Sequence, residues 1–210
     1  MINHPEVLKT PAKKVLAIFS RQQFIKNFYL AGGTALALQY GHRISVDLDF
    51  FCQKDFSTDI LIKKLSKLGK FELLNREQNT VEGILDGVKV SFMSYPYPQL
   101  KNTIAVVGNV SSATAEDIAV MKIMAVSGRN TKKDFIDLFW YARKSSSGLR
   151  EILDLVDAKY RGIKYDHYHI FRSLAYFDDA DQEPMPKMIL PASWREIKKF
   201  FISEVKKCSA

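Results

Sequence analysis

Two aspartates, Asp47 and Asp49, are separated by one apolar residue in the run SVDLDFF at residues 45–51. If this run is a strand, the two carboxylates share one face about 6.5 Å apart along the backbone, while Val46, Leu48 and Phe50 pack on the other face. Solvent-facing charges on an edge strand are the alternative. Asp is depleted in strands, however, and two carboxylates on one face repel each other unless a cation lies between them. We therefore expect Asp47 and Asp49 to bind Mg²⁺, which accepts carboxylate oxygens, waters and substrate phosphates as ligands.

A pair of glycines, Gly32 and Gly33, lies upstream of the aspartates and is followed by Thr34. The glycines leave the backbone bare enough to approach a phosphate, and the amides of the helix that starts here direct positive charge at it. Arg43 and Ser45 could contribute to the same phosphate site, although Arg43 could equally be a surface guanidinium near the carboxylates. A phosphate site beside a magnesium site indicates metal-assisted transfer from a nucleoside triphosphate (NTP).

Lys122 is the only charged residue in the apolar run IAVMKIMAV at residues 118–126. Burying an ammonium without a partner is costly, so Lys122 either extends to the surface or reaches a triphosphate or a carboxylate. We expect the variant Lys122→Met to keep nearly wild-type stability, because methionine retains most of the apolar stem. Asp134 and Asp137 follow on one face of a helix. Asp134 could simply be a helix N-terminal carboxylate, so we favour Asp137, which needs a cation such as Lys122, as the site member.

These motifs, in this order and spacing, resemble the AbiEii/AbiGii toxin family within the nucleotidyltransferase superfamily. The first motif is GGTALALQYGHRISVDLDFF at residues 32–51. The second is the Lys-bearing run at residues 117–129, followed by KKDFIDLF at residues 132–139. The resemblance covers roughly residues 30–140. It implies a Mg²⁺-dependent enzyme that moves a nucleotidyl group from an NTP to an acceptor. It also implies an RNA acceptor such as the tRNA 3′ end, and the role of a growth-arresting toxin in a toxin–antitoxin or abortive-infection system with a separate antitoxin.

The complete predicted site combines the phosphate-binding residues, the metal ligands and the catalytic residues: Gly32, Gly33, Thr34, Arg43, Ser45, Asp47, Asp49, Lys122, Asp134 and Asp137.

One position departs from the superfamily pattern, which usually places a third carboxylate on a later strand beside the metal pair. The candidate strand, VKVSFM at residues 88–93, offers Ser91 at that place and no acid. A third carboxylate commonly activates the attacking hydroxyl, so its absence puts two-metal chemistry in doubt. Either Asp137 or Glu82, on the neighbouring strand, could substitute for it.

The chain has 210 residues, a net charge of +8 and 47% apolar residues, the balance of an ordinary globular protein. Its basic charge favours a nucleic acid, nucleotide or acidic partner, and the cations Arg129, Lys132, Lys133, Arg143 and Lys144 could guide an RNA backbone. The two cysteines are far apart in the sequence, so a disulfide framework is not expected. No signal peptide and no apolar run near the ~20 residues of a membrane span is present, so we expect a cytoplasmic protein with no membrane association.

The N-terminal half predicts a mixed sheet with flanking helices. We expect strands at residues 28–31, 46–51, 80–85, 88–93 and 104–107, with Asp86-Gly87 forming a two-residue hairpin turn. Helices are expected at residues 34–40 and after Ser57, a good N-cap.

From Thr114 onwards the sequence is almost wholly helical, and residues 178–191 look like an ordered loop before the last helix. Possible capping boxes begin at Thr114, Thr131 and Ser193. We therefore predict an α/β (α+β) fold, with a nucleotidyltransferase-like core at residues 1–107 and a helical domain at residues 108–210.

Two other functions remain open from the sequence. A small-molecule nucleotidyltransferase would use the same glycine turn and carboxylates but would have a closed pocket without a basic track. A catalytically silent nucleotide-binding module would bind without turnover, and Ser91 makes this alternative relevant.

Overall fold

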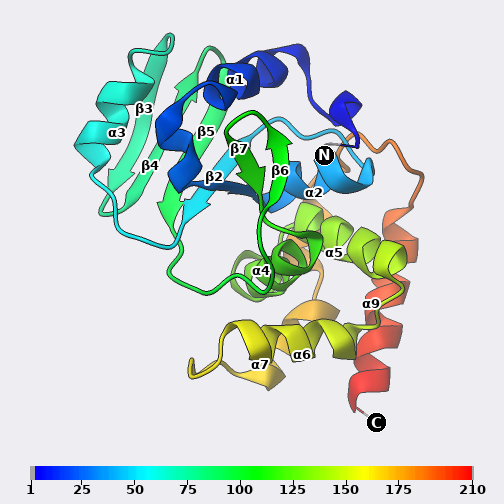
Figure 1. The fold of residues 1–210 in the computed structure, drawn as a ribbon. Coiled ribbons are helices and arrows are strands. Elements are labelled where there is room, and N and C mark those ends of the chain that lie inside the picture. The colour runs from blue at the N-terminus through cyan, green and yellow to red at the C-terminus, as the bar shows by residue number, and fades with distance from the viewer. Residues whose placement is uncertain (1–2, 210) are drawn as a thin grey trace.

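The computed structural model describes residues 3–209, in which seven strands form one mixed sheet (Figure 1). The strands are β1 (Tyr29–Ala31), β2 (Leu48–Cys52), β3 (Phe71–Glu77), β4 (Thr80–Leu85), β5 (Val88–Ser94), β6 (Ile104–Val107) and β7 (Val110–Ser112). Their order across the sheet is β3-β4-β5-β2-β1-β7-β6. The β2–β5 and β1–β7 pairs are parallel and the other pairs are antiparallel.

Helices cover both faces of this sheet. The α-helices are α1 (Thr10–Ser20), α2 (Gly32–Tyr40), α3 (Thr58–Leu65), α4 (Ala115–Arg129), α5 (Lys132–Ser145), α6 (Leu149–Lys159), α7 (His167–Ala175), α8 (Asp178–Gln182) and α9 (Trp194–Ser209). Two short 3-10 helices, η1 (Pro5–Val7) and η2 (Gln23–Asn27), flank α1. Helices α1 and α3 contact the sheet, whereas α2 contacts α4 and α5 and lies between the sheet and the helical half (Figure 1). The predicted α/β class is confirmed.

Strand β2 separates the apolar and acidic side chains as the sequence predicts. Leu48 and Phe50 are fully buried, and the Phe50 ring meets Phe19 of α1 at 5.3 Å between centroids. Asp49 points to the opposite face, as alternation requires. The strand begins at Leu48, however, so the predicted start at residue 46 is two residues early. Val46 lies before the strand and is 40% exposed, so the prediction that it packs with Leu48 and Phe50 is wrong.

The predicted hairpin between β4 and β5 is present. Leu85 pairs with Val88, and the two turn residues, Asp86 and Gly87, have φ angles of 48° and 80°. Positive φ at both central residues is the conformation that Asp-Gly favours in such turns.

Two strands of the sheet were not expected from the sequence. Strand β3 pairs with β4 and contains an irregularity in register between Leu73 and Asn75. Strand β7 pairs with β1, so the sheet continues through Ser112, beyond the boundary predicted at residue 107. The division into two domains stays a prediction.

The helical half follows most of the expected start signals. The hydroxyl oxygens of Thr114 and Ser193 accept backbone N–H bonds from Asp117 and Glu196. Thr131 makes no such cap, because its hydroxyl donates instead to the Asp134 carboxylate at 2.8 Å. The loop predicted at residues 178–191 contains the short helix α8, so that part of the prediction is wrong.

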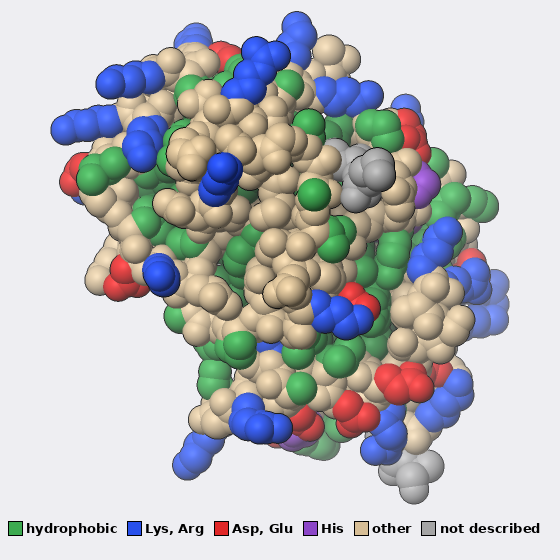
Figure 2. Space-filling model, in the orientation of Figure 1, with side chains coloured by type: hydrophobic (Ala, Val, Ile, Leu, Met, Phe, Trp, Pro, Cys, Tyr) green, Lys and Arg blue, Asp and Glu red, His purple; other side chains and the backbone are tan. Residues whose placement is uncertain are grey.

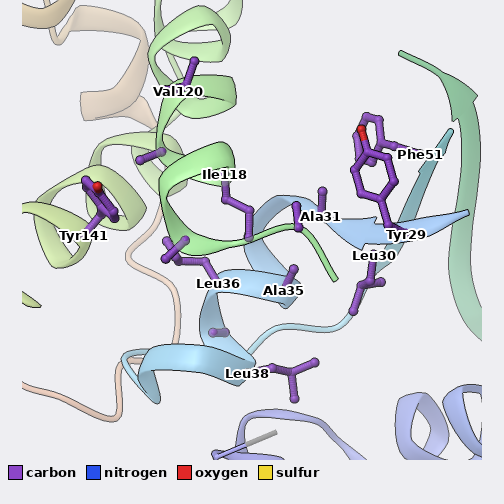
Figure 3. Close-up of a cluster of buried hydrophobic side chains, with 14 of the residues drawn as sticks. Tyr29, Leu30, Ala31, Ala35, Leu36, Leu38, Phe51, Ile118, Val120 and Tyr141 are labelled. Atoms are coloured by element: carbon purple, nitrogen blue, oxygen red, sulfur yellow. The ribbon is translucent and has the colours of Figure 1, made fainter. Parts of the chain in front are cut away.

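One hydrophobic cluster extends from the sheet into the helical half. Figure 3 shows part of it, with Leu36 of α2, Ile118 of α4 and the strand residues Leu30 and Ala31. All four side chains are fully buried. This shared core fixes α2 and α4 relative to β2, which is the arrangement that builds the site described next. None of the helices in residues 3–209 is both long and apolar enough to span a bilayer.

Candidate active site

A cavity of about 780 Å³ lies between the sheet, α2 and the helices α4 and α5. Nine of the ten predicted site residues line it: Gly32, Gly33, Thr34, Arg43, Ser45, Asp47, Asp49, Lys122 and Asp134. The tenth, Asp137, is fully buried behind the cavity wall. The structure therefore brings the glycine turn, the two aspartates and the lysine together from segments that are far apart in the sequence.

Asp47 and Asp49 both line the cavity, with Asp49 in β2 and Asp47 just before it. Burial raises the pKa of Asp49, and the nearby charge of Asp47 raises it further, while Lys122 and a hydrogen bond from Ser91 oppose these effects. A cation between the two carboxylates would relieve their repulsion.

The side chains around this pair suit Mg²⁺ better than a metal held wholly by protein ligands. Within residues 3–209 no three or more His, Cys, Asp or Glu side chains are grouped so that they could hold a metal ion. The protein therefore offers two hard carboxylate ligands at Asp47 and Asp49. Mg²⁺ commonly keeps several waters and takes further oxygens from substrate phosphates, so this donor set fits the ion.

The two glycines allow two charged groups to approach the backbone closely. Gly32 has a φ of +68°, and a Cβ at this position would lie 3.0 Å from Asp49 Oδ2. A Cβ on Gly33 would lie 2.0 Å from Arg43 Nη2, a distance that no side chain can occupy. The glycine pair is thus required by packing against Asp49 and Arg43, whatever it contributes to phosphate binding.

Hydroxyl groups fix the loop that leads from α2 to β2. The Thr34 hydroxyl lies 2.7 Å from Ser45 Oγ and donates to the backbone carbonyl of Asp47. Arg43 Nη1 donates to the Ile44 carbonyl at 3.2 Å and to Ser45 Oγ at 3.4 Å. Thr34 and Ser45 therefore hold the backbone on which Asp47 is carried.

Asp137 contacts three different side chains, two through hydrogen bonds and one, Lys122, through an ion pair. Arg43 forms a two-pronged contact with it, through Nε at 2.8 Å and Nη2 at 3.0 Å. His42 Nε2 lies 2.8 Å from its Oδ1, and Lys122 Nζ lies 2.8 Å from its Oδ2. Burial alone would raise the pKa of Asp137, but Arg43 and Lys122 hold it well below its usual range. The carboxylate is therefore ionised and anchors two cations.

Asp134 anchors a second set of donors and, unlike Asp137, reaches the cavity. Lys122 Nζ lies 2.6 Å from Asp134 Oδ1. Arg129 donates to the same carboxylate through Nε at 2.8 Å and Nη2 at 3.0 Å. Burial lowers the pKa of Lys122, but Asp137 and Asp134 outweigh it and leave the pKa raised, so the ammonium is charged.

The resulting cluster holds its cations in place before any substrate arrives. Three cations, Arg43, Lys122 and Arg129, share two carboxylates, which leaves one net positive charge beside the cavity. Lys122 donates to Asp134, pairs with Asp137 and also lines the cavity, where its ammonium can meet a ligand. Fixed charges of this kind stabilise developing negative charge without reorganisation.

Sequence reasoning placed Lys122 correctly next to a carboxylate but missed two members of the cluster. The sequence assigns Arg129 only to the cations that could guide RNA, and it predicts no role for His42. Arg129 lies five residues before Asp134, across the turn between α4 and α5, which was the available signal. For His42, whose contact with Asp137 depends on tertiary packing, the sequence offered none.

The chain is similar to known proteins over most of its length. A family model described as "Nucleotidyl transferase AbiEii toxin, Type IV TA system" matches residues 14–107 and 88–207. An uncharacterized protein of Aquifex aeolicus is 40% identical over 189 residues, covering 86% of this chain and 87% of that protein.

Two solved structures are more distant. A putative nucleotidyltransferase from H. pylori is 16% identical, with a TM-score of 0.49, over 94% of this chain and 95% of that one. The Megavirus polyadenylate synthase is 12% identical, with a TM-score of 0.45, over 63% of this chain, which spans only 32% of the viral one. The assignment therefore rests on the family model, which matches most of the sequence: the chain belongs to the AbiEii nucleotidyl transferase toxin family and is a nucleotidyltransferase.

Proposed function

We propose that this nucleotidyltransferase is Mg²⁺-dependent and moves a nucleotidyl group from an NTP to an RNA, with the tRNA 3′ end as the specific acceptor. The observation that carries this proposal is the cavity itself, where Asp47 and Asp49 lie on one wall and Lys122 on another. A triphosphate needs Mg²⁺ and a fixed positive charge beside it. This cavity offers two carboxylates that can hold Mg²⁺ and an anchored lysine.

In this proposal each part of the site has a separate task. Asp47 and Asp49 hold Mg²⁺, which when bound neutralises phosphate charge. Gly32, Gly33 and the amides that start α2 bind phosphate oxygens, and the Lys122 ammonium donates to the departing pyrophosphate. Asp137 acts through Arg43 and Lys122, which it positions, and does not touch the substrate.

Fewer basic residues are available to bind RNA than the sequence suggests. Lys132 turns toward Glu183, and Arg143 pairs with Glu196 at 2.6 Å. Lys89 and Lys133, by contrast, line the cavity and make no hydrogen bond or ion pair with a described residue. Figure 2 shows Lys and Arg scattered over one face of the molecule. Because Lys89 and Lys133 are the unpaired cations at the cavity within the part of the chain that the structure describes, we assign the entry of the polynucleotide to the cavity mouth.

The family also suggests the biological role. We propose that the chain is the toxin of a toxin–antitoxin or abortive-infection system, that modification of RNA arrests growth, and that a separate antitoxin counteracts it. Its expression should then slow growth, and Asp49→Asn should abolish that effect.

The direct test is a transfer assay. The full chain is incubated with each labelled NTP, Mg²⁺ and total cellular RNA, and the label on RNA is measured. Asp47→Asn and Asp49→Asn keep the shape but remove the charge, so transfer should fall by about 10²-fold or more while the variants remain folded. Asp59→Asn, an exposed carboxylate outside the cavity, is the matched control.

The same assay separates the competing functions. Label on small acceptors but not on RNA would indicate a small-molecule enzyme. Binding without transfer would indicate a silent module. For binding, the melting temperature should rise when Mg²⁺ and an NTP are added, because a ligand stabilises the state that binds it. Wild-type transfer by both aspartate variants would contradict the proposed metal site.

A further inference from the structure

Three polar residues form a row across the centre of the sheet. Asp49 of β2 lies opposite Ser91 of β5, and Ser91 lies opposite Glu82 of β4. Residues paired across neighbouring strands present their side chains on the same face. Asp49, Ser91 and Glu82 therefore all face the cavity, and all three line it.

The carboxylates that line the cavity divide into two groups. Asp134 is engaged by Lys122 and Arg129, and Glu183 accepts a backbone N–H from Lys132 at 2.9 Å. These two are held by the protein. The other three are Asp47, Asp49 and Glu82.

Within residues 3–209, Glu82 has no hydrogen-bond or ion-pair partner for its side chain, although it is only partly exposed. Because no described side chain occupies the Glu82 carboxylate and it lies on the cavity wall, it is available to a group bound in the cavity.

The alternative substitute for the missing third carboxylate, Asp137, does not meet this requirement. Its side chain is 0% exposed, and Arg43, His42 and Lys122 occupy both of its oxygens. It has no path to a reacting group in the cavity. The structure thus distinguishes between two candidates that the sequence leaves equal.

The geometry of the row also explains how a glutamate one strand farther away could act. Neighbouring strands lie about 4.8 Å apart, so the Glu82 and Asp49 backbones are about 10 Å apart. Ser91 between them is small and 2% exposed, and its hydroxyl bonds Asp49. Glutamate is one methylene longer than aspartate and extends over the cavity. An acceptor hydroxyl in the space above Ser91 would lie between Glu82 and the proposed metal ligands Asp47 and Asp49.

We propose that Glu82 is the general base of the reaction, an assignment that rests on the proposed nucleotidyl transfer. The acceptor oxygen forms a bond to the α-phosphorus of the NTP, and the bond from that phosphorus to the oxygen bridging the β-phosphorus breaks. Pyrophosphate leaves with the bonding electron pair. The proton of the attacking hydroxyl passes to a Glu82 carboxylate oxygen and from there to water.

The test compares Glu82→Gln with a matched control, Glu72→Gln. Glu72 lies in β3 and pairs with Ile84 of β4; it is exposed and does not line the cavity. The assay uses the full chain, Mg²⁺, labelled NTP and RNA. Glu82→Gln should lower kcat by about 10²-fold or more, as expected for loss of a general base, and Glu72→Gln should have no such effect. The shift in melting temperature caused by Mg²⁺ and NTP should be the same in both variants and in wild type.

A second variant, Glu82→Asp, tests the role of reach. It keeps the carboxylate but withdraws it by one methylene, so its kcat should lie between those of wild type and Glu82→Gln. If wild type transfers nucleotide and Glu82→Gln remains within about threefold of it, the assignment of the base is overturned while the proposed function stands. If Glu82→Gln loses the nucleotide-dependent melting shift, Glu82 is a binding residue and the assignment is again overturned. A wild type that transfers no nucleotide would contradict the proposed function itself.

Discussion

Arg43 and Asp137 lie 94 residues apart in the sequence and are joined by two parallel hydrogen bonds of 2.8 and 3.0 Å. The contact links the loop before β2 to the middle of α5. It therefore sets the distance between the predicted metal ligands, Asp47 and Asp49, and the helical half. Its two partners are almost wholly removed from water. Such a contact contributes to the geometry of the site only while both charges are present.

The first prediction concerns the stability of this contact. Asp137→Asn leaves the Arg43 guanidinium and the Lys122 ammonium buried without their shared carboxylate. We expect a loss of about 3–5 kcal/mol in the free energy of unfolding, measured by urea denaturation. Asp59→Asn removes one partner of the exposed Arg76–Asp59 pair and should cost only about 0–1 kcal/mol. Equal effects of the two variants would contradict the anchoring role of Asp137.

Lys122→Met is expected to behave differently from what its apolar stem alone suggests. The ammonium contacts Asp134 at 2.6 Å and Asp137 at 2.8 Å, so methionine removes a charged hydrogen bond to Asp134 and an ion pair with Asp137. Each carboxylate still keeps an arginine. We expect a loss of about 2–3 kcal/mol, smaller than for Asp137→Asn, together with weaker NTP binding. Calorimetric melting and nucleotide titration measure both, and an unaltered melting temperature would show that the two ion pairs add nothing.

Two glycine-to-alanine variants test the close approach of Arg43 to the backbone. In Gly33→Ala the new Cβ would lie 2.0 Å from Arg43 Nη2, so the guanidinium must leave Asp137 or the helix must shift. Gly128→Ala, inside α4, meets nothing within 4 Å and should stabilise the protein by about 0.5–1 kcal/mol. We expect Gly33→Ala to lower the melting temperature and Gly128→Ala to raise it. Stabilisation by both variants would mean that Arg43 is not fixed at Gly33.

The buried carboxylates predict a dependence of stability on acid pH. The pKa values of Asp134 and Asp137 are lowered in the folded protein, despite burial, by Lys122, Arg129 and Arg43. The unfolded chain, where Asp titrates near 3.9, therefore binds more protons below about pH 5. The stability they provide is complete above that pH and is lost as pH falls toward the folded pKa values. Urea denaturation between about pH 3 and 7 should show this loss, with a shallower slope for Asp137→Asn. Equal slopes would contradict it.

Salt dependence separates RNA from a small acceptor. If Lys89 and Lys133 bind RNA phosphates, the double variant Lys89→Glu/Lys133→Glu should weaken binding at low salt. It should also reduce the log–log salt slope by about 0.7 for each phosphate that the protein no longer neutralises. Arg143→Glu is the control, because Arg143 pairs with Glu196 and does not line the cavity. A filter-binding titration at several salt concentrations measures both, and an unchanged slope in the double variant would remove these lysines from the path.

Much of the sheet and the cavity wall could be predicted from the sequence, because their signals are local. Strict alternation placed Asp49 opposite Leu48 and Phe50, and Asp86-Gly87 determined a turn. Strand β3 was missed because its residues are exposed on both faces apart from Phe71, so no apolar alternation marks it. The sequence cannot decide whether Asp134 or Asp137 is the partner of Lys122. Both carboxylates pair with it once α4 and α5 pack together. Whether Glu82 or Asp137 reaches the cavity depends on the same long-range packing.

The irregular register of β3 has a consequence for how copies of this protein meet in solution. Strand β3 is the last strand of the sheet, and it exposes Leu73 and Leu74 by 44% and 51%. An open apolar edge of this kind is a template on which a second chain can add a strand and begin aggregation. The shift between Leu73 and Asn75 breaks the even spacing of its free backbone groups, and the charged side chains of Glu72 and Arg76 would lose water if another strand paired here. The distortion in the outermost strand thus protects the sheet from polymerising through its own edge.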